Sequence, residues 1–106
     1  MNKRQTIRAE KLRTTGHHRV SCRLLIWRFE NDYTQADAAI LLDLSLRKYQ
    51  RAESLGEYYD FKLSTLGAIA SVLDLKSFAK LLKQLSTKEL ETFQKAEQWR
   101  VEYRSR

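Results

Sequence analysis

Three polar side chains in one short segment are spaced so that all three could lie on one face of a helix and bind the same ligand. In "LSLRKYQRAE", residues 44–53, Arg47 and Arg51 stand four positions apart and Gln50 precedes the second arginine. If the segment is a helix, residues four apart lie on the same face. An arginine can donate two hydrogen bonds to O6 and N7 of a guanine, and a glutamine can bind an adenine or a phosphate. Leu46, if exposed on that face, fits the methyl group of a thymine.

The neighbouring polar residues are suited to a phosphate backbone. Ser45 and Lys48 adjoin the three side chains above, and Lys62 follows the loop "SLGEYYDF". We expect these three to contact phosphates, which position a protein without reading sequence. Residues 31–60 hold three Lys or Arg against six acids, and all three cations fall within residues 47–51. Such a concentration of cations in an otherwise acidic segment indicates that their positions serve a function.

Two short helices would position this cluster. Thr34 is a good N-cap, with Asp37 as an acidic first-turn partner, and opens the helix "QADAAILL". Asp43 stands at the turn, where its tolerance of a left-handed conformation is useful, and Ser45 caps the next helix. Two helices joined by so tight a turn form a helix-turn-helix pattern, in which the second helix can enter the DNA major groove. The inward positions would be Ala38, Ala39, Leu42, Leu44, Tyr49 and Ala52, with small alanines where the helices cross.

The rest of the chain also predicts helices, so the expected fold class is all-α. Val20, Leu24 and Trp27 have helical spacing in a segment that Asn31–Asp32 closes, and Gly16 with His17 and His18 indicates a break before it. Ser64 or Thr65 would cap "TLGAIASVL", Ser77 would open "FAKLLKQL", and the capping box "STKE" at residues 86–89 would open a last helix to about Tyr103.

Length and charge restrict the classes of protein. The chain has 106 residues, which indicates one domain, and a net charge of +7, which attracts polyanions. The first 30 residues hold eight Lys or Arg against two acids. We expect residues 1–18 to form a basic N-terminal arm, in which Lys3, Arg4 and Arg8 track phosphates or enter a minor groove. A solubilising tail is the alternative.

The stretch "LLIWRFENDYTQADAAILLDLSLRKYQRAE" resembles the Cro/C1-type (Xre family) helix-turn-helix proteins of phages and plasmids. The residues that carry the resemblance are Trp27-Arg28, Thr34-Gln35, Ala39, Leu42, Leu44-Ser45, Tyr49 and Glu53. It implies a lambda-repressor-like domain over residues 19–75, with a C-terminal helical extension over residues 76–106. It further implies a part-buried ion pair between Arg28 and Glu53. Gln35 would contact a phosphate and support the second helix of the motif.

Four positions depart from the family pattern. Asp43 stands where the family usually has Gly, and Tyr49 replaces an aliphatic residue, so its hydroxyl needs a partner. Ile40 and Leu41 occupy positions that are usually polar and exposed. We expect the N-terminal arm or the last helix to cover them.

The resemblance implies a sequence-specific double-stranded DNA-binding transcriptional regulator. The expected form is a homodimeric (auto)repressor of a phage, plasmid or other mobile element that binds a palindromic operator. The alternative is an antitoxin-type module whose C-terminal helices bind a partner protein. Apolar residues of the extension would either form the dimer interface or cap the monomer's own core; they are Phe78, Leu81, Leu82, Leu85, Leu90, Phe93, Trp99 and Tyr103.

Several other classes are not expected. No Gly-rich phosphate loop, metal-ligand cluster or nucleophile–base set is visible, so we expect no enzyme, no cofactor and no metal site. Cys22 lies among apolar residues and suggests packing. The two adjacent histidines would diverge on a helix, which argues against a shared metal ion. No apolar run is long enough to span a membrane, and a single cysteine fits a reducing cytoplasm.

Overall fold

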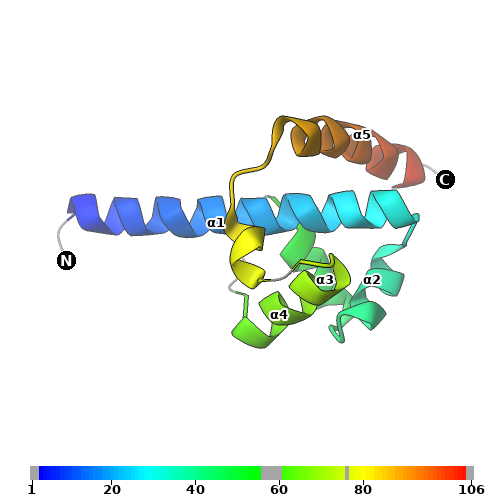
Figure 1. Cartoon of the computed structure of the whole chain (residues 1–106), viewed down its shortest axis with the longest axis horizontal. Coiled ribbons are helices and arrows are strands. Elements are labelled where there is room, and N and C mark those ends of the chain that lie inside the picture. Colours follow the sequence, from blue (N-terminus) through cyan, green and yellow to red (C-terminus); the bar gives the residue numbers. More distant parts are fainter. Residues whose placement is uncertain (1–2, 56–60, 76, 105–106) are drawn as a thin grey trace.

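The computed structural model describes residues 3–55, 61–75 and 77–104, with side chains from Gly16 onward except those of Phe78, Tyr103 and Arg104. These residues form five α-helices and one 3₁₀ helix, and no strand occurs among them (Figure 1). Helix α1 lies between two layers, with α2 to α4 on one side and α5 on the other. The described part of the chain is therefore all-helical, as the composition predicts.

Helix α1 (Lys3–Asn31) is continuous, so the predicted break at Gly16 is wrong. A glycine inside a helix costs about 1 kcal/mol relative to alanine. Tertiary contacts offset that cost here. The ring Nε2 of His17 binds the carbonyl of Ser54 at 2.9 Å, and that of His18 binds the carbonyl of Leu55 at 3.2 Å.

The N-terminal part of α1 projects beyond the other helices (Figure 1). The molecule measures 48 × 26 × 26 Å, and its long axis follows this helix. Residues 3–18, predicted as a basic arm, are thus helical and continuous with the rest of α1. The side chains of Lys3, Arg4 and Arg8 lie outside the described part of the structure.

The middle of α1 is buried on nearly every side. Because neighbouring helices pack on opposite faces, even its polar residues are enclosed. This explains why the segment shows no clean amphipathic pattern in the sequence. The buried residues are Val20, Ser21, Cys22, Arg23, Leu24, Leu25, Ile26, Trp27 and Arg28.

Helices α2 (Gln35–Leu41) and α3 (Leu46–Glu53) begin at the predicted caps. Thr34 and Asp37 form a reciprocal capping box, and the Ser45 hydroxyl accepts the N–H of Lys48 at 3.2 Å. Asp43 adopts the left-handed conformation, with φ of 55°. The six predicted inward residues are all buried except Leu44, which is half-buried.

Helix α4 (Leu63–Val72) begins earlier than predicted. Its N-cap is Lys62, so Ser64 and Thr65 lie in its first turn. Thr65 is buried, which a solvent-facing cap would not be. Asp74, just after the C-cap Leu73, adopts the left-handed conformation with φ of 56°.

The segment after Ser77 is a 3₁₀ helix, η1 (Phe78–Leu82), and not the longer α-helix predicted. Arg23 of α1 accounts for the early end of η1. Nη1 of Arg23 donates to the carbonyls of Leu81 and Lys83 at 2.7 and 2.8 Å, so these carbonyls bind α1 and do not accept from a further helical turn.

Helix α5 (Thr87–Arg104) opens with the predicted capping box between Ser86 and Glu89. It packs along α1 on the side opposite α2 (Figure 1). Within the described residues, no helix combines the length and the apolar character that crossing a membrane requires.

Candidate nucleic-acid interface

Helix α3 has one buried face and one exposed face. Tyr49, Ala52 and Glu53 are almost inaccessible to solvent. The predicted base-reading residues all lie on the outside, where Leu46 is 46% exposed. Lys48 is exposed beside them, and Ser45 is exposed at the N-terminal end of the helix. The exposed residues of α3 are Leu46, Arg47, Lys48, Gln50 and Arg51, which include three cations and no acid.

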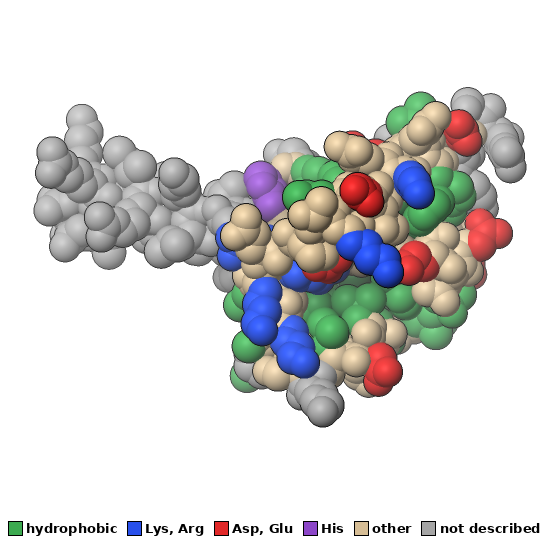
Figure 2. Space-filling view, turned by 45° about the horizontal axis from the view of Figure 1, so that its top comes forward, with side chains coloured by type: hydrophobic (Ala, Val, Ile, Leu, Met, Phe, Trp, Pro, Cys, Tyr) green, Lys and Arg blue, Asp and Glu red, His purple; other side chains and the backbone are tan. Residues whose placement is uncertain are grey.

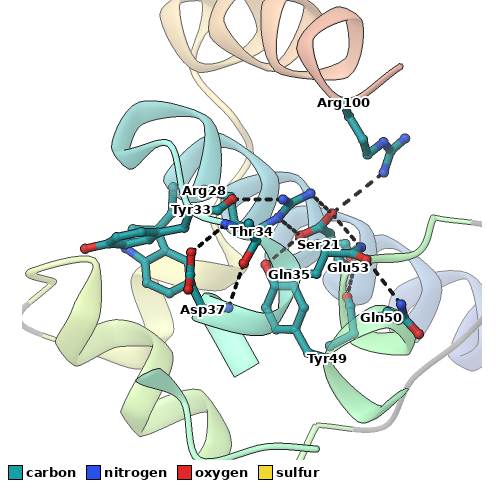
Figure 3. A network of polar contacts seen from close by, with 12 residues as sticks. Ser21, Arg28, Tyr33, Thr34, Gln35, Asp37, Tyr49, Gln50, Glu53 and Arg100 are labelled. Atoms are coloured by element: carbon teal, nitrogen blue, oxygen red, sulfur yellow. Dashed lines mark hydrogen bonds and ion pairs between the residues drawn. The ribbon is translucent and has the colours of Figure 1, made fainter. Parts of the chain in front are cut away.

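Arg28 and Glu53 form a buried two-point ion pair (Figure 3). Nε and Nη2 of Arg28 donate to the two carboxylate oxygens of Glu53 at 2.6 and 2.7 Å. Nη1 also donates to the carbonyl of Tyr33 at 3.0 Å. Burial alone would lower the pKa of Arg28, but the hydrogen bond to Glu53 and its charge outweigh burial and raise it. The pair therefore connects α1, the α1–α2 turn and the end of α3.

Glu53, in the same helix, is the partner that the Tyr49 hydroxyl needs. Its Oη donates to Oε2 of Glu53 at 2.5 Å. Burial and the adjacent carboxylate together raise the pKa of Tyr49, so the hydroxyl stays protonated and continues to donate. An aliphatic residue at this position could not make this bond.

Gln35 and Gln50 extend the network to the molecular surface (Figure 3). Nε2 of Gln35 donates to Oε1 of Glu53 at 3.4 Å, and Nε2 of Gln50 donates to Oε1 of Gln35 at 3.3 Å. A carboxylate can only accept, so Glu53 determines which way both amides face. Gln50 keeps its carbonyl oxygen and one N–H for an external partner. We call Arg28, Gln35, Tyr49 and Glu53 the Glu53 cluster.

The prediction for Ile40 and Leu41 is wrong. These two residues are 78% and 50% exposed, and no described part of the chain covers them. The reason is that α5 lies across α1 from α2, while the N-terminal part of α1 projects away from α2 at the other end of the molecule (Figure 1). Lys62, the remaining predicted phosphate contact, is exposed as the N-cap of α4.

Sequence reasoning missed three α1 residues that bind the C-terminal end of α3. Ser21 Oγ donates to the carbonyl of Ala52 at 2.5 Å, and the two histidines described above bind the carbonyls of Ser54 and Leu55. The carbonyl of Ala52 is in the last turn of α3 and that of Ser54 is at its C-cap, so Ser21 and His17 satisfy carbonyls that a helix end leaves without internal partners. Ser21 beside the apolar run at residues 24–27, with polar His17 one turn before it, was the available signal.

A different surface lies beside α5. It contains a hollow of about 230 Å³ between α1, the end of α4 and the start of α5. Figure 2 looks onto this side and shows hydrophobic side chains in the hollow with both cations and acids around it. Its charges are mixed, unlike those of α3. The lining residues are Arg23, Ile26, Glu30, Leu73, Leu75, Ser86, Lys88, Glu89 and Thr92.

Comparison with known protein families, curated proteins and solved structures finds no match to this chain. Among the described residues, no three His, Cys, Asp or Glu side chains are grouped so that they could bind a metal ion. Burial, followed by the charge of Glu97, raises the pKa of Cys22 to about 11. Its thiol is therefore protonated at neutral pH and is a poor nucleophile.

Proposed function

We propose that this chain is a sequence-specific double-stranded DNA-binding transcriptional regulator with a lambda-repressor-like helix-turn-helix of the Cro/C1-type (Xre family). The observation that carries the proposal is that α3 has a buried inner face and an exposed outer face with different side chains. Its inner face is locked by the Glu53 cluster, while Arg47, Gln50 and Arg51 project from its outer face. A helix presented in this way fits the major groove, which is about 12 Å wide.

The outward side chains have the chemistry to distinguish bases. Arg47 and Arg51 can each donate two hydrogen bonds to a guanine, and Leu46 can contact a thymine methyl. Gln50 offers one acceptor and one donor, because its other N–H binds Gln35. That pair of groups matches N6 and N7 of adenine. Guanine would require two donors, so we propose adenine as the preferred partner of Gln50.

Phosphate contacts would surround this reading surface. Ser45, Lys48 and Lys62 are exposed next to it, and Gln35 begins α2 at its edge. The projecting part of α1 would add contacts from Lys3, Arg4 and Arg8. An α-helix is about 10–12 Å across and a minor groove about 6 Å wide, so helical residues 3–18 would follow phosphates and not enter that groove.

A homodimer acting as a cytoplasmic (auto)repressor is the form we propose. Two copies would read the halves of a palindromic operator about 34 Å apart, one DNA turn. Leu81 and Ala96 of the C-terminal extension pack inside the monomer, whereas Leu82, Leu90 and Val101 remain exposed. These three are candidates for the dimer contact. Light scattering should give twice the chain mass, and a monomer that instead binds a partner protein through α5 would favour an antitoxin-type module.

Selection of duplexes from a random DNA library would test the function. We expect one preferred palindromic sequence. Arg47→Ala or Arg51→Ala should weaken binding to it by about 1–3 kcal/mol and relax the choice at one base pair. Lys62→Ala is the matched control, since it removes the same charge but should weaken binding to all DNA sequences about equally. Uniform weakening by all three variants would contradict base reading by α3.

A further inference from the structure

The C-terminal end of α5 reaches the buried ion pair at the end of α3. The guanidinium carbon of Arg28 lies 5.2 Å from the centroid of the Trp99 ring. Trp99 also contacts Phe29 edge-on, with ring centroids 5.7 Å apart. Nη1 of Arg100 lies 4.0 Å from Oε1 of Glu53 (Figure 3). Two successive residues of α5 thus contact both members of the pair.

The ion pair that these α5 residues contact is nearly inaccessible to solvent. The Glu53 side chain is 1% exposed and that of Arg28 is 3% exposed, so Coulomb attraction between them is stronger than at a surface. The Trp99 ring lies over the Arg28 guanidinium and helps exclude water from it. Arg100 adds a second cation near the carboxylate, while its other nitrogen lies 4.0 Å from Glu97 in the same helix. The extra positive charge is therefore partly balanced within α5.

The consequence extends to the surface of α3. Glu53 is its last residue and also determines the direction of the Gln35 and Gln50 amides. Any displacement of Glu53 would release both amides and the end of the helix at once. If α5 moved away, water would reach the ion pair, and an exposed pair contributes little.

We propose that Trp99 and Arg100 are positioning residues, and that docking of α5 on α1 fixes the C-terminal end of α3 in the orientation from which it binds its ligand. The ligand part of this inference rests on the proposed DNA-binding function. The structural part does not, because it concerns α3 in the free protein. Removal of α5, by mutation or by a partner that captures it, lowers DNA affinity without altering any residue that touches DNA.

Hydrogen exchange and DNA binding in three α5 variants test this. Arg100→Ala removes the contact, Arg100→Lys keeps the charge, and Lys95→Ala removes an exposed cation of the same helix as the matched control. In Arg100→Ala, amide exchange across residues 49–54 should accelerate about 3–10-fold, with a similar loss of affinity for the selected duplex. Arg100→Lys should retain most of the slow amide exchange and most of the DNA affinity. Lys95→Ala should leave exchange at α3 unchanged.

The two proposals fail in different ways. Equal exchange at α3 in Arg100→Ala and Lys95→Ala would overturn the positioning role, whatever the DNA measurement shows. Accelerated exchange with unchanged DNA affinity would also overturn it, because the orientation of α3 would then not matter for binding. Failure of the unmodified protein to select any duplex would overturn the DNA-binding function, and exchange at α3 would still decide whether α5 positions that helix.

Discussion

At the scale of single residues, Glu53 contributes most to the placement of α3. Its carboxylate accepts hydrogen bonds from Arg28 of α1, Gln35 of α2 and Tyr49 of α3 itself. The pairing with Arg28 was predictable only through the family resemblance. The resemblance implied that Gln35 supports α3, and the Tyr49 hydroxyl was expected to need a partner, but Glu53 as the shared acceptor was not predictable, because side-chain directions are not determined by sequence spacing.

Replacing Glu53 by alanine should be strongly destabilising. The substitution leaves Arg28 buried without its anion, which typically costs about 3–5 kcal/mol. Urea unfolding followed by circular dichroism would measure the loss. Glu91→Ala removes an exposed acid and should change the free energy of unfolding by less than about 0.5 kcal/mol. Similar stability of the two variants would show that the buried pair is not required.

Cys22 should react slowly with thiol reagents in the folded protein. Its side chain is buried, and its pKa of about 11 keeps the thiol protonated at pH 8. Addition of denaturant should accelerate the reaction by exposing the thiol. Rapid and complete labelling of the native protein at pH 8 would contradict the buried, unreactive state of this residue.

At the scale of the elements, sequence reasoning was most accurate where local rules determine the structure. The caps Thr34, Ser45 and Ser86 depend on side chains bonding to nearby backbone, and the turn at Asp43 depends on its tolerance of a left-handed conformation; the structure confirms all four. The predictions failed where distant contacts override local preference. Gly16 does not interrupt α1, because residues 17 and 18 bind the end of α3, and Arg23 ends η1 from another helix.

The close crossing of α2 with its neighbours should be sensitive to side-chain size. Ala39 is 3% exposed, so a leucine there has no space and should destabilise the fold by about 1–3 kcal/mol. Ala36 lies exposed in the same helix, and Ala36→Leu is the matched control. Thermal unfolding would compare the two. Equal melting temperatures would show that the crossing tolerates bulk.

The start of α5 should depend on pH through Glu89. Burial alone would raise its pKa, but hydrogen bonds from the Ser86 backbone and from Arg23 outweigh it, so the folded pKa is lowered. Its contribution is therefore present above the unfolded value of about 4.3 and is lost as pH falls through the folded value. The stability difference between the unmodified protein and Glu89→Gln should shrink below about pH 4. A difference that stays constant from pH 6 to pH 3 would contradict this.

At the scale of the whole molecule, α1 divides two surfaces with different properties. The helices α2 to α4 lie on one side of α1 and α5 lies on the other (Figure 1). On the first side, α3 presents three exposed cations. Caps, the turn at Asp43 and the alanines at the crossing predicted the first side well. The burial of α1 on both sides was not predicted, because such a helix has no single apolar face to detect.

The most direct test of the DNA-binding proposal is a titration of ¹⁵N-labelled protein with the selected duplex, followed by amide chemical shifts. We expect the largest changes at residues 45–51 and smaller ones at Gln35 and Lys62, and we expect all of them to decrease as the salt concentration increases. Residues lining the hollow beside α5 should change little. Changes concentrated on the outer face of α5, with residues 45–51 unaffected, would contradict the proposal that α3 is the DNA-reading helix.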